Sequence, residues 1–182
     1  MSKKGKVISA VVVVAGCLAL VGSVMQNNSQ ANGKVSLEGF GKVLEKEYKN
    51  PEDASTKNLY AKGKYSEITK SDMEKAIVYY KSAGMSDEEA EKEAYKYEKE
   101  SAAFYTEAIK AGCETTDKEV ADYVSDIRTE YEEKKMDEAS LKEFDEIIAQ
   151  FDSPEDYWKY EKTIYRELLP MIKYNKQLEK EY

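Results

Sequence analysis

The stretch AGCETTDKEVADYV, residues 111–124, contains both the end of one predicted helix and the start of the next. Gly112 follows a long helical pattern, at the position where helices often end because glycine accepts a left-handed backbone conformation. Thr116 precedes Glu119 by three residues, which is the spacing of a capping box that opens a helix. This punctuation predicts two helices joined by a short corner.

Cys113 lies in that corner, between the two predicted helices. A reactive thiol needs a nearby base or cationic surroundings. The neighbours that follow it include Glu114 and Asp117, which are acidic, and the chain has no histidine. We therefore expect Cys113 to be a small buried residue under the corner, not a nucleophile.

Helix-start signals recur along the chain, whereas alternating strand-like runs do not follow the N-terminal segment. A Ser or Thr with an acid three residues later occurs at Thr69, Ser86, Ser140 and Ser153, the last followed by Pro154. We predict helices at residues 36–48, 69–83, 86–111, 116–135, 140–150 and 153–180. Residues 49–68 are expected to be irregular or to contain a short helix. The predicted fold is all-α, an irregular multi-helix domain.

The first 31 residues have the pattern of an export signal or an anchor. Three lysines precede 19 uncharged residues, 7–25, which as a helix would cover about 28 Å, close to the thickness of a bilayer's hydrocarbon core. A transmembrane anchor, a signal cleaved near Ala31 and a lipoprotein signal with lipidation at Cys17 remain open. Each alternative exports residues 32–182. We expect a cell-membrane protein with one N-terminal anchor and an extracytoplasmic body, or else a secreted protein or lipoprotein.

Composition argues against several classes of function. Residues 1–25 hold three of the 28 lysines and arginines and none of the 36 acids, so the remainder carries a net charge of −11. Such an acidic body does not suit nucleic acid. Without histidine, the usual catalytic base and a frequent metal ligand are missing. We predict no enzyme activity, no catalytic residue, no metal and no cofactor. The alternating charges of DEEAEKEAYKYEKE, residues 87–100, indicate a solvated helix face.

Three segments resemble a known family in their helix punctuation and apolar spacing. They are FYTEAIKAGCETTDKEVADYVSDI (104–127), FDSPEDYWKYEKTIYRELLPMIKYNKQLEKE (151–181) and ANGKVSLEGF (31–40). Together they resemble the N-terminal helical domain of SurA-type exported chaperones and the related PrsA-like foldases. Pro170, inside the last predicted helix, departs from that pattern. The chain ends at Tyr182 without a parvulin domain, so the resemblance implies peptide binding without isomerase activity.

The 15 tyrosines suggest two roles, helix–helix packing or a cradle for apolar segments of client chains. For the cradle, the predicted peptide-binding residues are Tyr97, Phe104, Tyr105, Tyr157, Trp158, Tyr165 and Leu169. The partners would be non-native exported polypeptides, with the membrane contacted through the N-terminal segment. The alternative is an adaptor that docks a specific envelope protein or dimerises through the Tyr/Leu stripe of its last helix.

Overall fold

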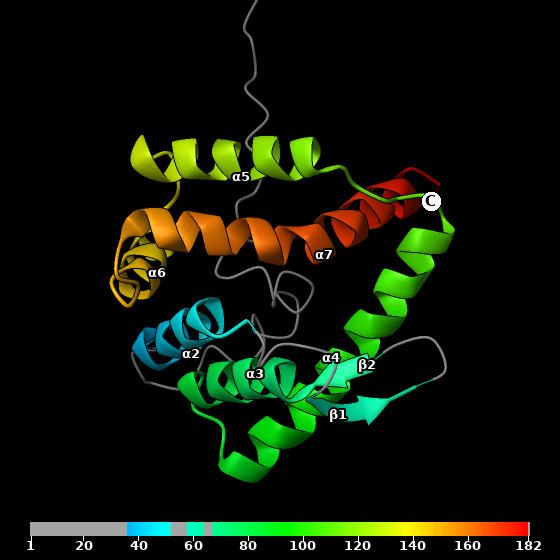
Figure 1. Cartoon of the computed structure of the whole chain (residues 1–182), viewed down its shortest axis with the longest axis horizontal. Coiled ribbons are helices and arrows are strands. Elements are labelled where there is room, and N and C mark those ends of the chain that lie inside the picture. The colour runs from blue at the N-terminus through cyan, green and yellow to red at the C-terminus, as the bar shows by residue number, and fades with distance from the viewer. Residues whose placement is uncertain (1–35, 52–57, 64–66, 182) are drawn as a thin grey trace, which may run out of the picture.

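A computed structural model describes residues 36–51, 58–63 and 67–181. The predicted anchor or signal segment, residues 1–31, lies outside these residues. Within the described part, six helices and one small hairpin are present (Figure 1). Their bounds are α2 Glu38–Lys49, β1 Leu59–Lys62, β2 Glu67–Thr69, α3 Lys70–Ser82, α4 Asp87–Lys110, α5 Asp117–Glu132, α6 Glu138–Ile148 and α7 Pro154–Glu181. The six predicted helices are confirmed, and the fold is mostly helical.

The hairpin corrects the all-α prediction, because residues 49–68 were expected to be irregular or helical. Strands β1 and β2 are antiparallel, and the register slips between Leu59, which pairs with Thr69, and Ala61, which pairs with Ile68. The Lys70 N–H donates to the Asn58 carbonyl at 2.8 Å and continues the pairing. With four and three residues, these strands are too short to show a convincing alternation in sequence.

Local capping explains where most helices begin. Capping boxes are present at Thr69, Ser86 and Thr116, as the spacing of their acidic partners predicts. Gly112 has a φ of 76°, in the left-handed region that glycine accepts without strain. One predicted cap is wrong: α6 begins after Asp137, whose carboxylate accepts the Ser140 N–H at 2.9 Å.

The final helix begins at Pro154, with the Asp156 N–H donating to the Ser153 hydroxyl at 3.2 Å. It continues through Pro170 to Glu181 as one helix. Pro170 is fully buried, so its ring contributes to the interior while it removes one backbone donor.

Two apolar cores organise the described residues. The larger core joins α2, α5, α6, α7 and the end of α4, with Phe40, Phe144 and Tyr157 almost completely buried. Cys113 belongs to it, 4% exposed, and its thiol lies 3.0 Å from the Gln177 side-chain oxygen, so the predicted burial is confirmed. The smaller core joins β2, α3 and the first half of α4. Helix α4 therefore contributes to both cores.

Figure 1 shows how α4 connects the two cores. Helices α5 and α7 pack side by side, and α3 packs on α4 beside the hairpin. Helix α4 runs obliquely from the α3 layer to the level of α7 and contacts both helices. Helix α2 contacts α3 on one side and α6 on the other.

A buried ion pair also holds α2 against α3. Lys75 and Glu47 have side chains 8% and 9% exposed, and their charged atoms lie 3.0 Å apart. The Glu47 carboxylate also accepts hydrogen bonds from Ser71 at 2.5 Å and from Tyr160 at 3.3 Å. Separating the two charges would leave each of them buried without a partner, which costs free energy. The contacts of Glu47 therefore hold α2 in place against α3 and α7.

Replacing Thr116 with alanine is expected to lower the free energy of unfolding by about 1 kcal/mol. The substitution removes the hydroxyl that accepts the Glu119 N–H at 3.2 Å at the start of α5. Urea unfolding followed by the fluorescence of Trp158 measures the loss, because this side chain is 3% exposed and is the only tryptophan in the sequence. Thr115→Ala, one residue earlier, is the control. An equal loss in both variants would show that the cap is not responsible.

Candidate polypeptide-binding cleft

Most of the predicted peptide-binding residues lie in the cores. Trp158 is 3% exposed, Leu169 is 7% exposed, and Tyr157 and Tyr165 are both 0% exposed, all in the larger core. Tyr97, 7% exposed, lies in the smaller core. In this structure these five side chains pack against the protein itself and are not accessible to a client.

Phe104 and Tyr105 are the two predicted residues that stay partly exposed. The Phe104 ring packs against Tyr174 of α7, with ring centroids 5.2 Å apart. Tyr105, the next residue on α4, lines a cleft between α4 and α7. Of the seven predicted residues, Tyr105 lines the cleft, Phe104 packs against α7 outside its lining, and the other five lie in the cores.

The cleft has a volume of about 550 Å³ and lies where the hairpin, α3, α4 and α7 meet. Its lining residues are Lys62, Gly63, Glu67, Asp72, Glu98, Ser101, Ala102, Tyr105, Thr106, Glu167 and Met171. Helix α4 contributes five of them at spacings of three and four residues, which places them on one face of that helix. The volume is in the range of pockets that hold small ligands or a few residues of a peptide.

The lining combines apolar and polar groups. Tyr105 offers apolar surface, whereas Met171 is 5% exposed and belongs to the larger core. Ser101 and Thr106 carry hydroxyls, of which the Thr106 hydroxyl donates to the Ala102 carbonyl at 2.8 Å. Such a lining can bury an apolar side chain while leaving hydrogen-bonding groups for a peptide backbone.

Four carboxylates line the cleft, and two of them have nearby cations. Glu67 pairs with Lys62 at 2.6 Å across the hairpin. Asp72 completes the capping box of α3, where its carboxylate accepts the Thr69 N–H at 2.9 Å, and it lies 3.3 Å from Lys75. The other two, Glu98 and Glu167, make neither a hydrogen bond nor an ion pair with the described residues.

The surroundings of Glu98 and Glu167 favour their neutral forms. Burial, followed by the charge of Asp72, raises the pKa of Glu98 to about 8. Burial also raises the pKa of Glu167, the more exposed of the two, and Asp72 adds to the effect. Lys75 opposes both shifts but does not cancel them. The free cleft therefore holds Glu98 in its protonated form near neutral pH, and a cation bound beside it would favour the ionised form.

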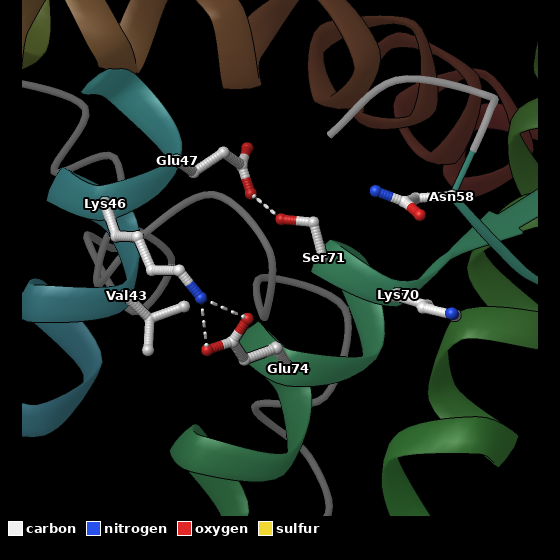
Figure 2. A pocket seen from close by; sticks show the side chains of 7 residues that line it. All are labelled: Val43, Lys46, Glu47, Asn58, Lys70, Ser71 and Glu74. Atoms are coloured by element: carbon white, nitrogen blue, oxygen red, sulfur yellow. Dashed lines mark hydrogen bonds and ion pairs between the residues drawn. The ribbon is translucent and has the colours of Figure 1, made fainter. Parts of the chain in front are cut away.

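A second, smaller pocket lies between α2 and α3 (Figure 2). Its volume is about 130 Å³, and its charged groups compensate one another, because Lys46 lies 3.0 Å from Glu74. In Figure 2 the Ser71 hydroxyl points to Glu47 across the pocket and donates to it at 2.5 Å. The small size and internal pairing make this pocket a packing feature between two helices.

Sequence reasoning identified Tyr105 but missed the acidic side of the cleft. Glu98 lies in the charged run 87–100, which was interpreted as a solvated face. The signal that could have found it is its spacing from Ala102 and Tyr105, which places all three on one helix face. In the sequence, Asp72 is recognisable only as the acid three residues after Thr69 in a capping box. Nothing in the sequence indicates that Glu167 lies near Asp72.

The described residues contain no group of three or more His, Cys, Asp or Glu side chains arranged to hold a metal ion. None of the helices in the described ranges is long and apolar enough to cross a bilayer. Comparison with known proteins finds no match for the chain among family models, curated proteins or solved structures.

Proposed function

We propose that the chain is a membrane-associated extracytoplasmic domain that binds unfolded or newly exported polypeptides, as a chaperone does, without isomerase activity. The observation that carries this proposal is the cleft of about 550 Å³ between the hairpin, α4 and α7. Tyr105 would cover an apolar client side chain, and Ser101 would bond to the client's backbone. Binding would need no cofactor and no turnover.

In this proposal the binding surface is smaller than the aromatic stripe expected from the sequence. The client contacts would come from Tyr105 inside the cleft and from Phe104 at its side. Tyr97, Tyr157, Trp158, Tyr165 and Leu169 support the cleft from within, because they hold α4 and α7 in the cores. A site of this size binds a short stretch of a chain, so each contact would be weak and many clients would fit.

An adaptor that docks one specific partner is the second candidate. It is favoured by Tyr60 of β1 and Tyr95 of α4, 44% and 40% exposed, which lie with ring centroids 6.0 Å apart. Exposed aromatic pairs are frequent at protein–protein contacts. Dimerisation through the Tyr/Leu stripe of α7 is less suited to the structure, because Tyr165, Leu168 and Leu169 are buried within the chain.

Filling the cleft tests the proposed function. Ala102 lines the cleft, whereas Ala103 is exposed and does not line it. We expect the unaltered protein to slow the aggregation of several unrelated unfolded proteins at near-stoichiometric ratios. Ala102→Trp should need about tenfold more protein for the same effect, a loss of about 1.4 kcal/mol in binding, because the indole occupies the client's place.

Ala103→Trp adds the same side chain to the same helix and should keep full activity. Circular dichroism of both variants checks that they fold alike. The proposal fails if the unaltered protein protects none of the aggregating proteins, or if both variants protect equally well. Protection of none combined with the capture of one partner, abolished by Tyr95→Ala, would support the adaptor.

A further inference from the structure

We infer that the cleft selects polypeptide segments carrying a lysine or arginine, whose cationic group lies between Glu98 and Glu167 while its stem packs along Tyr105. This inference rests on the proposed function and names the chemistry of the segment that the cleft accepts. It is carried by the charges that line the cleft and by the arrangement of apolar groups beside them.

The charges of the described residues around the cleft do not balance. The hairpin contributes one internal pair, Lys62 with Glu67 at 2.6 Å. Beneath the cleft, Lys75 of α3 lies within 3.3 Å of Asp72 and 3.0 Å of Glu47. Its single positive charge is thus shared between two carboxylates. The carboxyl groups of Glu98 and Glu167 form no ion pair with a cation of the described residues.

Glu98 and Glu167 come from different helices, α4 and α7, and both line the cleft. Each is close enough to Asp72 for its negative charge to raise the pKa, and Glu167 raises that of Glu98 in turn. A positive group placed among them relieves this repulsion and favours the ionised forms. The cleft is therefore complementary in charge to a cation.

The rest of the lining indicates an organic cation on a long stem. The described residues offer no arrangement of three or more ligands for a metal ion. The ring of Tyr105 instead provides apolar surface within the same cleft. Lysine and arginine bury their methylene stems along such surface while their charged ends reach carboxylates, and a ring face also attracts the cation.

Binding of paired peptides tests the inference. Labelled peptides would share one sequence, with lysine, arginine, glutamine or glutamate at a central position. For the unaltered protein we expect the lysine and arginine peptides to bind about tenfold more tightly than the glutamine peptide, and the glutamate peptide more weakly. The double variant Glu98→Gln/Glu167→Gln should lose this preference, so that the lysine, arginine and glutamine peptides bind to it with similar affinity.

Glu100→Gln/Glu179→Gln is the matched control, because it removes two exposed carboxylates from the same helices, α4 and α7, outside the cleft. Both double variants remove two carboxyl groups from the same two helices, so a preference based on overall charge would weaken in the control at least as much as in Glu98→Gln/Glu167→Gln. The inference is overturned if the unaltered protein does not distinguish the peptides. It is also overturned if the preference survives Glu98→Gln/Glu167→Gln.

The pH dependence provides a second readout. With the pKa of Glu98 at about 8, the free cleft holds a proton that a bound cation displaces. The groups that face this carboxyl are Asp72 and Lys75 of α3, Glu167 of α7 and Glu47 of α2. Affinity for the lysine peptide should therefore rise about tenfold between about pH 6.5 and about pH 8, and affinity for the glutamine peptide should not.

The outcomes separate this inference from the proposed function. Equal binding of all four peptides, abolished by Ala102→Trp, would keep the peptide-binding function and overturn the cation preference. Binding of no peptide would overturn both. Self-association of the protein that Ala102→Trp abolishes, without peptide binding, would assign the cleft to a second copy of the chain and also overturn both.

Discussion

Glu161→Gln is expected to stabilise the protein by about 3 kcal/mol at about pH 8 and to have little effect at about pH 4. Glu161 lies in the middle of α7 and is 0% exposed. Neither of its carboxylate oxygens has a hydrogen-bond partner of normal geometry among the described residues, and the same holds for the hydroxyl of Tyr157, one turn earlier. An acid in this position is accommodated best when it is neutral.

The direction of this pH dependence follows from the difference in the pKa of Glu161 between the folded and unfolded states. Burial raises the pKa of Glu161 from 4.5 to about 7, with Tyr157 opposing the shift. The folded protein therefore binds its proton more tightly than the unfolded chain does. Stability from the neutral acid is fully present below about pH 4.5 and is lost as the pH rises to about 7. Glutamine has no proton to lose, so its stability does not follow this curve.

Urea unfolding of the unaltered protein and of Glu161→Gln at a series of pH values measures the difference. The gap between their free energies of unfolding should open between about pH 4.5 and about pH 7 and then stay constant. Glu179→Gln, an exposed change on the same helix, should show no such gap. A gap that is the same at all pH values would mean that Glu161 is not neutral in the fold.

Two glycines in α2 should respond in opposite directions to the same substitution. A methyl group on Gly41 would lie 2.8 Å from Cγ of Gln150 and 3.1 Å from both the Cα and the carbonyl oxygen of Ile147. The Gln150 side chain can move, but the α6 backbone cannot without repacking the larger core. Gly41→Ala should therefore destabilise the protein by about 2 kcal/mol.

Gly39→Ala places the same methyl group two residues earlier, 3.8 Å from Cγ1 of Val78, which is an ordinary contact. Alanine is the better helix former, so this variant should gain about 0.5–1 kcal/mol. Urea unfolding of the two variants side by side measures a difference of about 3 kcal/mol. Equal effects of either sign would mean that α2 does not pack on α6 at Gly41.

Signals within a few residues made the helices predictable from the sequence. Thr116 and Glu119 lie three positions apart, and Gly112 ends the preceding helix, so a short window contains all the information. The hairpin was not predicted because its pairing of Ala61 with Ile68 depends on contacts with α3 and α4, not on a long alternating pattern in the sequence.

The cleft was only partly predictable because it depends on contacts between distant segments. The apolar stripe of α7 was visible in the sequence, but whether a partner covers it was not. Phe151 packs against Tyr157 with ring centroids 5.4 Å apart, which turns a predicted binding residue into core. Conversely, Glu98 and Glu167 look like ordinary surface acids until α4 and α7 are brought together.

Helix α4 has a mechanical consequence that follows from its membership of both cores. Ala94 fixes its first half to α3, and Ala108 fixes its second half among the helices of the larger core. A change in the tilt of α4 would disturb packing in both cores at once. The two cores are therefore mechanically coupled through this one helix. If a ligand binds in the cleft beside α4, we expect it to stabilise the packing at both ends of this helix, so that the smaller core and the larger core unfold together.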